Sequence, residues 1–305
     1  MKTPPLQPGD RVALCATARA VTPEEMQPAI DTLHGWGLEV MVPVGLYARA
    51  GQLAGDDAHR AAIMQSLIDD PSVKAIVCCR GGYGTVRVID RLDFTPLLAK
   101  PKWLVGYSDF TVVHCHASRL GLPTLHATMP INFTPCPTPA TESLRRALFG
   151  HPVDIGWQAA EGSDSGVELR GVEVVGGNLS IVYSLLGSAS QPRTRGRVLL
   201  IEDLDEYLYH IDRMMQALRR AGMLDGLRAL LVGGMTDLHD NTVPFGMDAV
   251  QIVRQATAGL GFPVIFGAPF GHLGGGNMAL PLGERLNISC DNRNNCRIFA
   301  ADLCC

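Results

Sequence analysis

The chain has 305 residues, and its 26 Lys and Arg residues against 30 Asp and Glu residues give a net charge of −4 at pH 7. Charged residues make up only 18% of the chain, which excludes a disordered polar chain and a charged coiled coil. This balance, without a dense Lys/Arg run, gives no electrostatic reason to bind nucleic acid. No stretch reaches the roughly 18 apolar residues of a membrane helix, so we expect no membrane partner.

The cysteines and the N-terminus indicate the compartment. Nine cysteines form no C-x-x-C pair and are odd in number, so we do not expect a secreted disulfide framework. The first residues lack the apolar stretch of a signal peptide. We therefore expect a reducing, cytoplasmic setting, in which the cysteine-rich tail with Cys296, Cys304 and Cys305 has no evident function.

Strands and helices alternate through the first half of the chain. Apolar runs predict strands at residues 11–16, 38–42, 73–78 and 103–106. Capping residues and helical spacing predict helices at residues 23–36, 56–67, 85–92 and 110–120. Repeated β-α-β units imply a parallel sheet with helices on both faces, so residues 1–150 are expected to form an N-terminal α/β domain.

The regular alternation of predicted strands and helices ends at a proline-rich segment, residues 134–139. A helix is expected at 140–149, and the polar, glycine-rich segment 151–166 is expected to be a linker. Beyond it the pattern predicts strands at residues 172–175, 198–201, 229–232, 263–266 and 285–289, with helices at 207–221 and 247–258. Residues 167–305 should therefore form a second, mixed α/β domain.

A serine follows the predicted strand 103–106. Ser108 lies in the turn Gly106–Phe110, where a strand ends and a helix begins. Ligands of open parallel sheets bind beyond the carboxyl ends of the strands, and N–H groups at a helix N-terminus attract anions. The turn therefore predicts a nucleophile with an oxyanion hole. Phe110 departs from the full nucleophile-elbow pattern, and the alternative is that Ser108 or Asp109 only caps the helix.

A glycine-rich loop, Arg80–Gly84, follows the strand expected to be buried at 73–78. Its glycines allow a ligand to approach the backbone, although the spacing fits neither a Walker loop nor a dinucleotide fingerprint. Arg80 beside them predicts a clamp for a carboxylate. The alternatives are a turn without a ligand, and an arginine that pairs with an acid such as Asp109 and only braces the loop.

Two further strand ends supply an acid and a histidine. Glu202 and Asp203 end the strand at 198–201, and His272 lies in a glycine-rich loop after the strand at 263–266. Each signal alone is weak, because most acids and histidines are solvated or structural. With Ser108 they give the chain order Ser, acid, His, in which the histidine takes the serine proton and the acid holds the imidazole tautomer.

A metal site is the competing chemistry. His114 and His116 are two residues apart, so on a helix their side chains point in different directions. Adding Cys115, His126 or Asp109 produces no established ligand spacing. We expect no metal.

Five motifs occur in one order along the chain. They are Arg80–Gly84, Gly106–Asp109, Gly176–Leu179, Ile201–Asp203, and Gly271-His272 followed by Asn277 and Leu280–Gly283. Together they resemble the LD-carboxypeptidase family of serine peptidases, over residues 12 to about 288. The resemblance implies an α/β protein with an N-terminal parallel-sheet domain similar to class I glutamine amidotransferases and a C-terminal swivelling β/β/α-like domain, with the active site between them.

The resemblance also assigns residues. It implies a catalytic triad of Ser108 as nucleophile, Glu202 as acid and His272 as general base. It implies an oxyanion hole formed by backbone N–H groups of Asp109 and of either Gly81 or Gly82. Arg80 and Asn178 are expected to bind substrate.

The usual substrate of the family is the murein tetrapeptide, a small muropeptide. The resemblance implies removal of its terminal D-Ala, next to an L-centre of diaminopimelate, in cytoplasmic peptidoglycan recycling. It further implies a homodimer that needs neither a cofactor nor a metal.

Two alternatives stay open. A sister branch of the family inactivates microcin C-type peptidyl-nucleotides and carries an extra aromatic loop that stacks on the nucleobase. Here the segment 187–197 is short and has no aromatic residue, which favours the murein branch. The other alternative is a non-catalytic binding module, or an esterase of another substrate, on the same fold. A catalytic triad predicts that His272 lies near hydrogen-bond distance of both Ser108 Oγ and Glu202.

Overall fold

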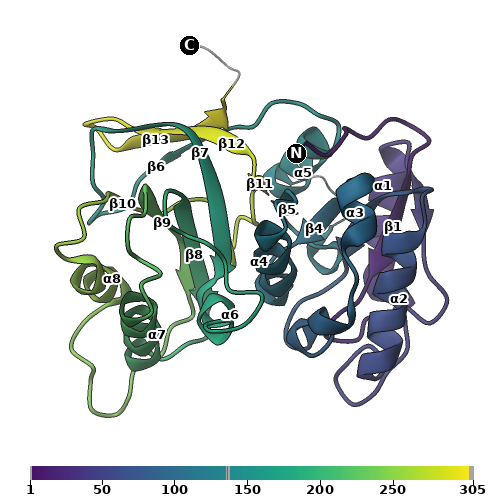
Figure 1. Cartoon of the computed structure of the whole chain (residues 1–305), viewed down its shortest axis with the longest axis horizontal. Coiled ribbons are helices and arrows are strands. Elements are labelled where there is room, and N and C mark those ends of the chain that lie inside the picture. The colour runs from purple at the N-terminus through teal and green to yellow at the C-terminus, as the bar shows by residue number, and fades with distance from the viewer. Residues whose placement is uncertain (1, 135, 137, 302–305) are drawn as a thin grey trace.

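The computed structural model describes residues 2–134, 136 and 138–301, which form two halves side by side, each built on a β-sheet (Figure 1). The N-terminal half carries a six-stranded sheet and the C-terminal half a seven-stranded one. The prediction of an α/β protein with two sheet-centred parts is confirmed.

The N-terminal sheet has the strand order β11-β5-β4-β3-β1-β2. Its strands are β1 (Arg11–Cys15), β2 (Glu39–Met41), β3 (Val73–Cys78), β4 (Trp103–Gly106), β5 (Thr124–His126) and β11 (Leu280–Leu282). Strands β1 to β5 are parallel, and β11 pairs antiparallel with β5. The helices of this half are α1 (Pro23–Gly35), α2 (Asp57–Asp69), α3 (Thr95–Ala99), α4 (Thr111–Arg119) and α5 (Pro139–Leu148). The apolar residues of β3 and β4 are buried, as expected for central strands of a parallel sheet.

The C-terminal sheet has the order β10-β9-β8-β7-β12-β13-β6. Its strands are β6 (Asp154–Gln158), β7 (Val167–Asn178), β8 (Val198–Leu204), β9 (Ala229–Thr236), β10 (Val264–Phe266), β12 (Arg285–Cys290) and β13 (Asn295–Ala300). Strands β7 to β10 are parallel, and β12, β13 and β6 continue the sheet antiparallel from β7. The helices of this half are α6 (Leu179–Ser184), α7 (Leu208–Arg220) and α8 (Ala249–Thr257).

Two predicted segments differ from the structure. The helix expected at 85–92 is two short 3₁₀ turns, Thr85–Arg87 and Ile89–Arg91. Four of its first five residues are β-branched, which disfavours an α-helix by restricting side-chain rotamers. The segment expected as the linker 151–166 contains strand β6, which completes the second sheet by pairing with β13.

One strand crosses from the second half to the first. Strand β11 belongs to the sequence expected as the C-terminal domain, yet its Leu280 and Leu282 pair with His126 and Thr124 of β5. The region 167–305 therefore supplies the edge of the N-terminal sheet, and the two halves share more than a linker.

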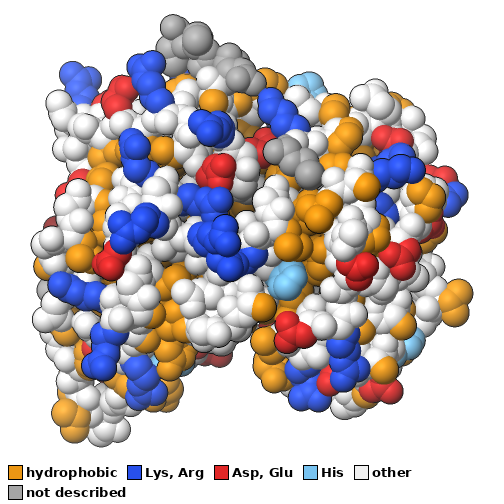
Figure 2. Space-filling model, viewed as in Figure 1, with side chains coloured by type: hydrophobic (Ala, Val, Ile, Leu, Met, Phe, Trp, Pro, Cys, Tyr) orange, Lys and Arg blue, Asp and Glu red, His pale blue; other side chains and the backbone are white. Residues whose placement is uncertain are grey.

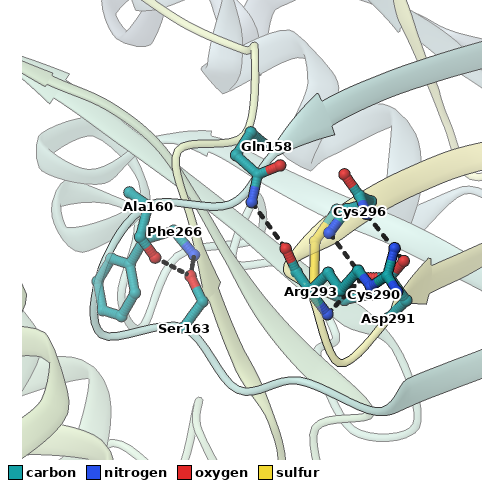
Figure 3. The surroundings of a disulfide bond; sticks show 9 residues. Gln158, Ala160, Ser163, Phe266, Cys290, Asp291, Arg293 and Cys296 are labelled. Atoms are coloured by element: carbon teal, nitrogen blue, oxygen red, sulfur yellow. Dashed lines mark hydrogen bonds between the residues drawn. A yellow bond between two sulfur atoms is a disulfide. The ribbon is translucent and has the colours of Figure 1, made fainter.

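A disulfide joins the hairpin of β12 and β13 (Figure 3). Cys290 and Cys296 occupy facing positions on the two strands, and Asp291 Oδ1 accepts hydrogen bonds from the turn. The sequence analysis grouped Cys296 with the tail and gave it no function; in the structure it lies in β13 and is bonded to Cys290 of β12. Cys304 and Cys305 lie outside the described residues.

The surface carries charge of both signs. Figure 2 shows acidic and basic side chains spread over one face, with the basic ones more frequent over the C-terminal half. In the part of the chain that the structure describes, no helix combines the length and apolar character needed to cross a membrane.

Candidate active site

A cavity of about 420 Å³ lies where the two halves meet. From the N-terminal half it is lined by Arg19, Arg80, Gly81, Gly82, Tyr107, Ser108 and Asp109, among others. From the C-terminal half it is lined by Asn178, Ser180, Asp203, Asp205, Glu206 and His272, among others. Several of these residues follow the carboxyl ends of parallel strands β3, β4, β7 and β8, the place where open parallel sheets bind ligands.

Ser108 occupies a strained position at the end of β4. Its φ of 61° lies in the left-handed region, which is unusual for a serine and marks a tight turn into the 3₁₀ helix Ser108–Phe110. Neither this turn nor helix α4 receives a side-chain capping bond at its N-terminus. Ser108 lines the cavity, and its side chain does not cap either element.

The glycine loop lies directly against this serine. A Cβ placed on Gly81 would come within 2.9 Å of Ser108 Oγ and 3.4 Å of the Asp109 backbone nitrogen, whereas one on Gly82 would meet the side chain of Arg19. Gly81 is thus the nearer of the two glycines to Ser108 and to the Asp109 N–H group. This contact favours Gly81 over Gly82 as the second oxyanion-hole residue.

The carboxylate of Asp109 fixes the backbone immediately after the glycine loop. Asp109 is buried, and its Oδ2 accepts a hydrogen bond of 2.8 Å from the backbone N–H of Thr85. Burial raises the pKa of Asp109 above its usual value. The alternative that Arg80 pairs with an acid is confirmed, but the acid is Glu25 and not Asp109, because Arg80 Nη1 lies 3.3 Å from Glu25 Oε1.

Glu202 and His272 form a buried pair. Glu202 is fully buried at the end of β8, and its Oε2 lies 2.7 Å from His272 Nδ1. The same oxygen accepts the backbone N–H of His272 at 3.3 Å. These contacts fix the imidazole with Nδ1 toward the acid and leave Nε2 available to act as a base.

The loop that carries His272 is fitted closely to the acid. Gly271 has a φ of +98°, and a Cβ there would lie 2.5 Å from Glu202 Oε2, so only glycine is accommodated. The Gly271 N–H donates to Asn277 Oδ1 at 2.8 Å, and Thr236 Oγ1 donates to the His272 carbonyl at 2.9 Å. The glycine and asparagine of this motif therefore place the histidine.

Tyr107 forms the other contact of the histidine ring. The ring centroids of Tyr107 and His272 are 4.8 Å apart, and the tyrosine hydroxyl accepts a 2.7 Å hydrogen bond from Asn132. Burial raises the pKa of Tyr107 to about 12, so the phenol stays protonated at neutral pH. Of the two hydrogen bonds expected of His272, the described residues form the one with Glu202 but not the one with Ser108 Oγ, although Ser108 and His272 line the same cavity. Catalytic hydrogen bonds often form only when the substrate binds.

Asn178 lines the cavity, but its side chain is already hydrogen-bonded to neighbouring residues of the C-terminal half. Its Nδ2 donates to Asp203 Oδ1 at 2.8 Å, and its Oδ1 accepts the N–H of Ile181 at 3.2 Å as the cap of α6. Asp203 is also buried, and burial together with the neighbouring Glu202 raises its pKa to about 6. The sequence analysis gave Asp203 no role, although its place after Glu202 at a strand end was visible.

The histidines considered for a metal have other partners. The His114 ring bonds Gly106 O at 2.9 Å and Thr124 Oγ1 at 2.8 Å, while His116 bonds Ser190. Within the described ranges no group of three or more His, Cys, Asp or Glu residues is placed to hold a metal ion.

We expect His114 to make the protein less stable in mild acid. Burial lowers its pKa from 6.5 to about 4, so the folded state keeps it neutral. The contribution of neutral His114 to the free energy of unfolding is fully present above pH 6.5 and is lost as the pH falls toward 4. The total loss is about 3 kcal/mol, at about 1.36 kcal/mol per pKa unit. Urea unfolding at pH 7 and pH 5 should show a smaller pH effect for His114→Gln than for the unmodified protein. An equal pH effect in both would contradict this assignment.

Comparison with known proteins identifies the family. A family model described as LD-carboxypeptidase N-terminal domain matches residues 12–127, and one described as LD-carboxypeptidase C-terminal domain matches residues 172–288. The chain belongs to the LD-carboxypeptidase family. A putative carboxypeptidase of Streptomyces coelicolor is 36% identical over 94% of this chain and 92% of its own length. The murein tetrapeptide carboxypeptidase of Pseudomonas aeruginosa is 28% identical over 91% of this chain and 93% of its own.

Solved structures agree with this assignment. The muramoyltetrapeptide carboxypeptidase of Oxalobacter formigenes superposes with a TM-score of 0.86 at 26% identity, covering 96% of this chain and 99% of that one. The microcin C7 self-immunity protein MccF superposes with a TM-score of 0.81 at 21% identity, covering 96% and 97%. At that identity the second likeness shows the shared fold alone. The predicted family and two-domain α/β fold are confirmed.

Proposed function

We propose that this LD-carboxypeptidase removes the terminal D-Ala from murein tetrapeptide by a Ser108–His272–Glu202 triad. The observation that carries the proposal is the Glu202–His272 pair at 2.7 Å, buried beside a cavity that a strained serine also lines. The names of the Pseudomonas and Oxalobacter relatives support the murein substrate.

The chemistry proceeds through an acyl-enzyme. Ser108 Oγ attacks the carbonyl carbon of the scissile amide while His272 Nε2 takes the hydroxyl proton. The backbone N–H groups of Asp109 and Gly81 stabilise the oxyanion of the tetrahedral intermediate. His272 then protonates the amine of the departing D-Ala, and water, activated by the same histidine, hydrolyses the ester and releases the shortened peptide.

The test is a direct product analysis. The purified protein should convert murein tetrapeptide to the tripeptide and free D-Ala, and mass spectrometry should show loss of one alanine residue. A pentapeptide that ends in D-Ala-D-Ala serves as the control, because its terminal bond joins two D-centres. An intact tetrapeptide after prolonged incubation would contradict the proposal.

The microcin alternative is less well supported. The segment 187–197 contains no aromatic residue for stacking on a nucleobase. This segment is held by hydrogen bonds to other parts of the protein: Ser190 Oγ lies 2.9 Å from His116 Nδ1, and Thr194 Oγ1 donates to the Met223 carbonyl. An aminoacyl sulfamoyl nucleoside offered in competition with the tetrapeptide would distinguish the two functions. A role in peptidoglycan recycling, a cytoplasmic location and a homodimer stay predictions.

A further inference from the structure

Two arginines of the N-terminal half, Arg19 and Arg80, line the cavity. The guanidinium of Arg80 already lies 3.3 Å from the carboxylate of Glu25. In the part of the chain that the structure describes, Arg19 has no ion pair, and its side chain is exposed. The sequence analysis considered only Arg80, and Arg19 is a second cation, without an ion-pair partner among the described residues.

The place of Arg19 is set by the glycine loop. Its side chain lies across Gly82, where a Cβ would come within 2.7 Å of Arg19 Cδ and Nε. A side chain at position 82 would therefore displace the arginine, and glycine leaves room for it. Gly81, the preceding residue of the loop, lies against Ser108. The Arg19 side chain therefore contacts the loop residue next to the one that contacts the nucleophile.

A carboxypeptidase must bind a free terminal carboxylate, which a cation or converging N–H groups can do. Only one amide nitrogen and one Cα separate the scissile carbonyl carbon from the terminal carboxylate carbon, so the group that binds the carboxylate must lie close to the oxyanion hole. The C-terminal half lines the cavity with Asp203, Asp205 and Glu206, which repel a carboxylate. The charges of the cavity thus direct the carboxylate toward Arg19 and Arg80.

We propose that Arg19 is a specificity-determining residue that binds the terminal carboxylate of the substrate, beside Arg80. The inference rests on the proposed function, because it assumes cleavage next to a free C-terminus. A planar guanidinium can form two parallel hydrogen bonds with a carboxylate, which is stronger and more directional than one ammonium contact.

The experiment compares two substrates that differ only at the terminus. The kcat/KM of Arg19→Gln is measured on the tetrapeptide free acid and on its C-terminal carboxamide. We expect a loss of roughly 10- to 150-fold on the acid, as for a charge-assisted hydrogen bond, and little change on the amide. Arg19→Lys should recover part of the loss, since it restores the charge without the fork.

Two controls separate this inference from its premises. Arg119→Gln removes an exposed arginine at the end of α4, outside the cavity, and should leave both substrates unaffected. Arg80→Gln, measured in parallel, shows how much of the preference for the free acid over the carboxamide depends on Arg80. An unchanged acid-to-amide ratio in Arg19→Gln would overturn the inference even if the enzyme is active. A wild-type protein that cleaves neither substrate would instead refute the proposed function, and the inference with it.

Discussion

Replacing Ser108 with alanine should reduce tetrapeptide cleavage by roughly 10⁴- to 10⁶-fold, as the loss of a triad nucleophile does in other serine hydrolases. This substitution removes only the side-chain hydroxyl group. The variant should still bind the substrate, because the cavity walls are unchanged. Release of D-Ala, followed by mass spectrometry or a coupled alanine assay, measures the effect.

The fold of this variant is checked separately. The left-handed backbone of Ser108 costs alanine as much as serine, so the urea midpoint should change little. Ser180→Ala is a matched control, because it removes another serine hydroxyl at the same cavity. Retained turnover by a folded Ser108→Ala protein would show that another group is the nucleophile.

Replacing Glu202 with glutamine should lower kcat by about 10⁴-fold with little change in KM, the magnitude seen when a triad acid becomes an amide. In the structure Glu202 Oε2 accepts from both Nδ1 and the backbone N–H of His272. A glutamine amide directed at Nδ1 donates instead, which holds the ring in the other tautomer with the proton on Nε2. The base would then be unable to accept the serine proton.

The control for this variant is another acid of the same cavity. Glu206 lines the cavity and bonds His210 at 2.6 Å, so Glu206→Gln removes a neighbouring charge outside the triad. Its effect on kcat should be far smaller. Equal losses in the two variants would mean that the charge of the cavity, and not the His272 tautomer, is what matters.

Much of the site could be predicted because parallel strands end at one edge of a sheet. The apolar runs of β3, β4 and β8 were visible in the sequence. Arg80–Gly82 and Ser108, after the first two strands, line the cavity, and Glu202, near the end of β8, holds His272, which also lines it. The turn at Ser108 was also visible, because a short strand and a helix leave few residues between them.

Other features depend on contacts between distant segments. Strand β6 is a short edge strand of mixed polarity, and only its pairing with β13 shows that it is not a loop. Arg19 carries no motif, and its place in the cavity follows from packing against Gly82. The pairing of Arg80 with Glu25, instead of Asp109, depends on how α1 packs beside the glycine loop.

Strand β11 constrains when the molecule can fold during synthesis. The ribosome delivers the N-terminal half first, but β5 lacks its second neighbour until Leu280–Leu282 has emerged. Until then the nascent sheet has an open edge at β5, with unpaired backbone groups that can pair with other chains. The sheet that carries the nucleophile is therefore completed only after His272 of the other half has been made.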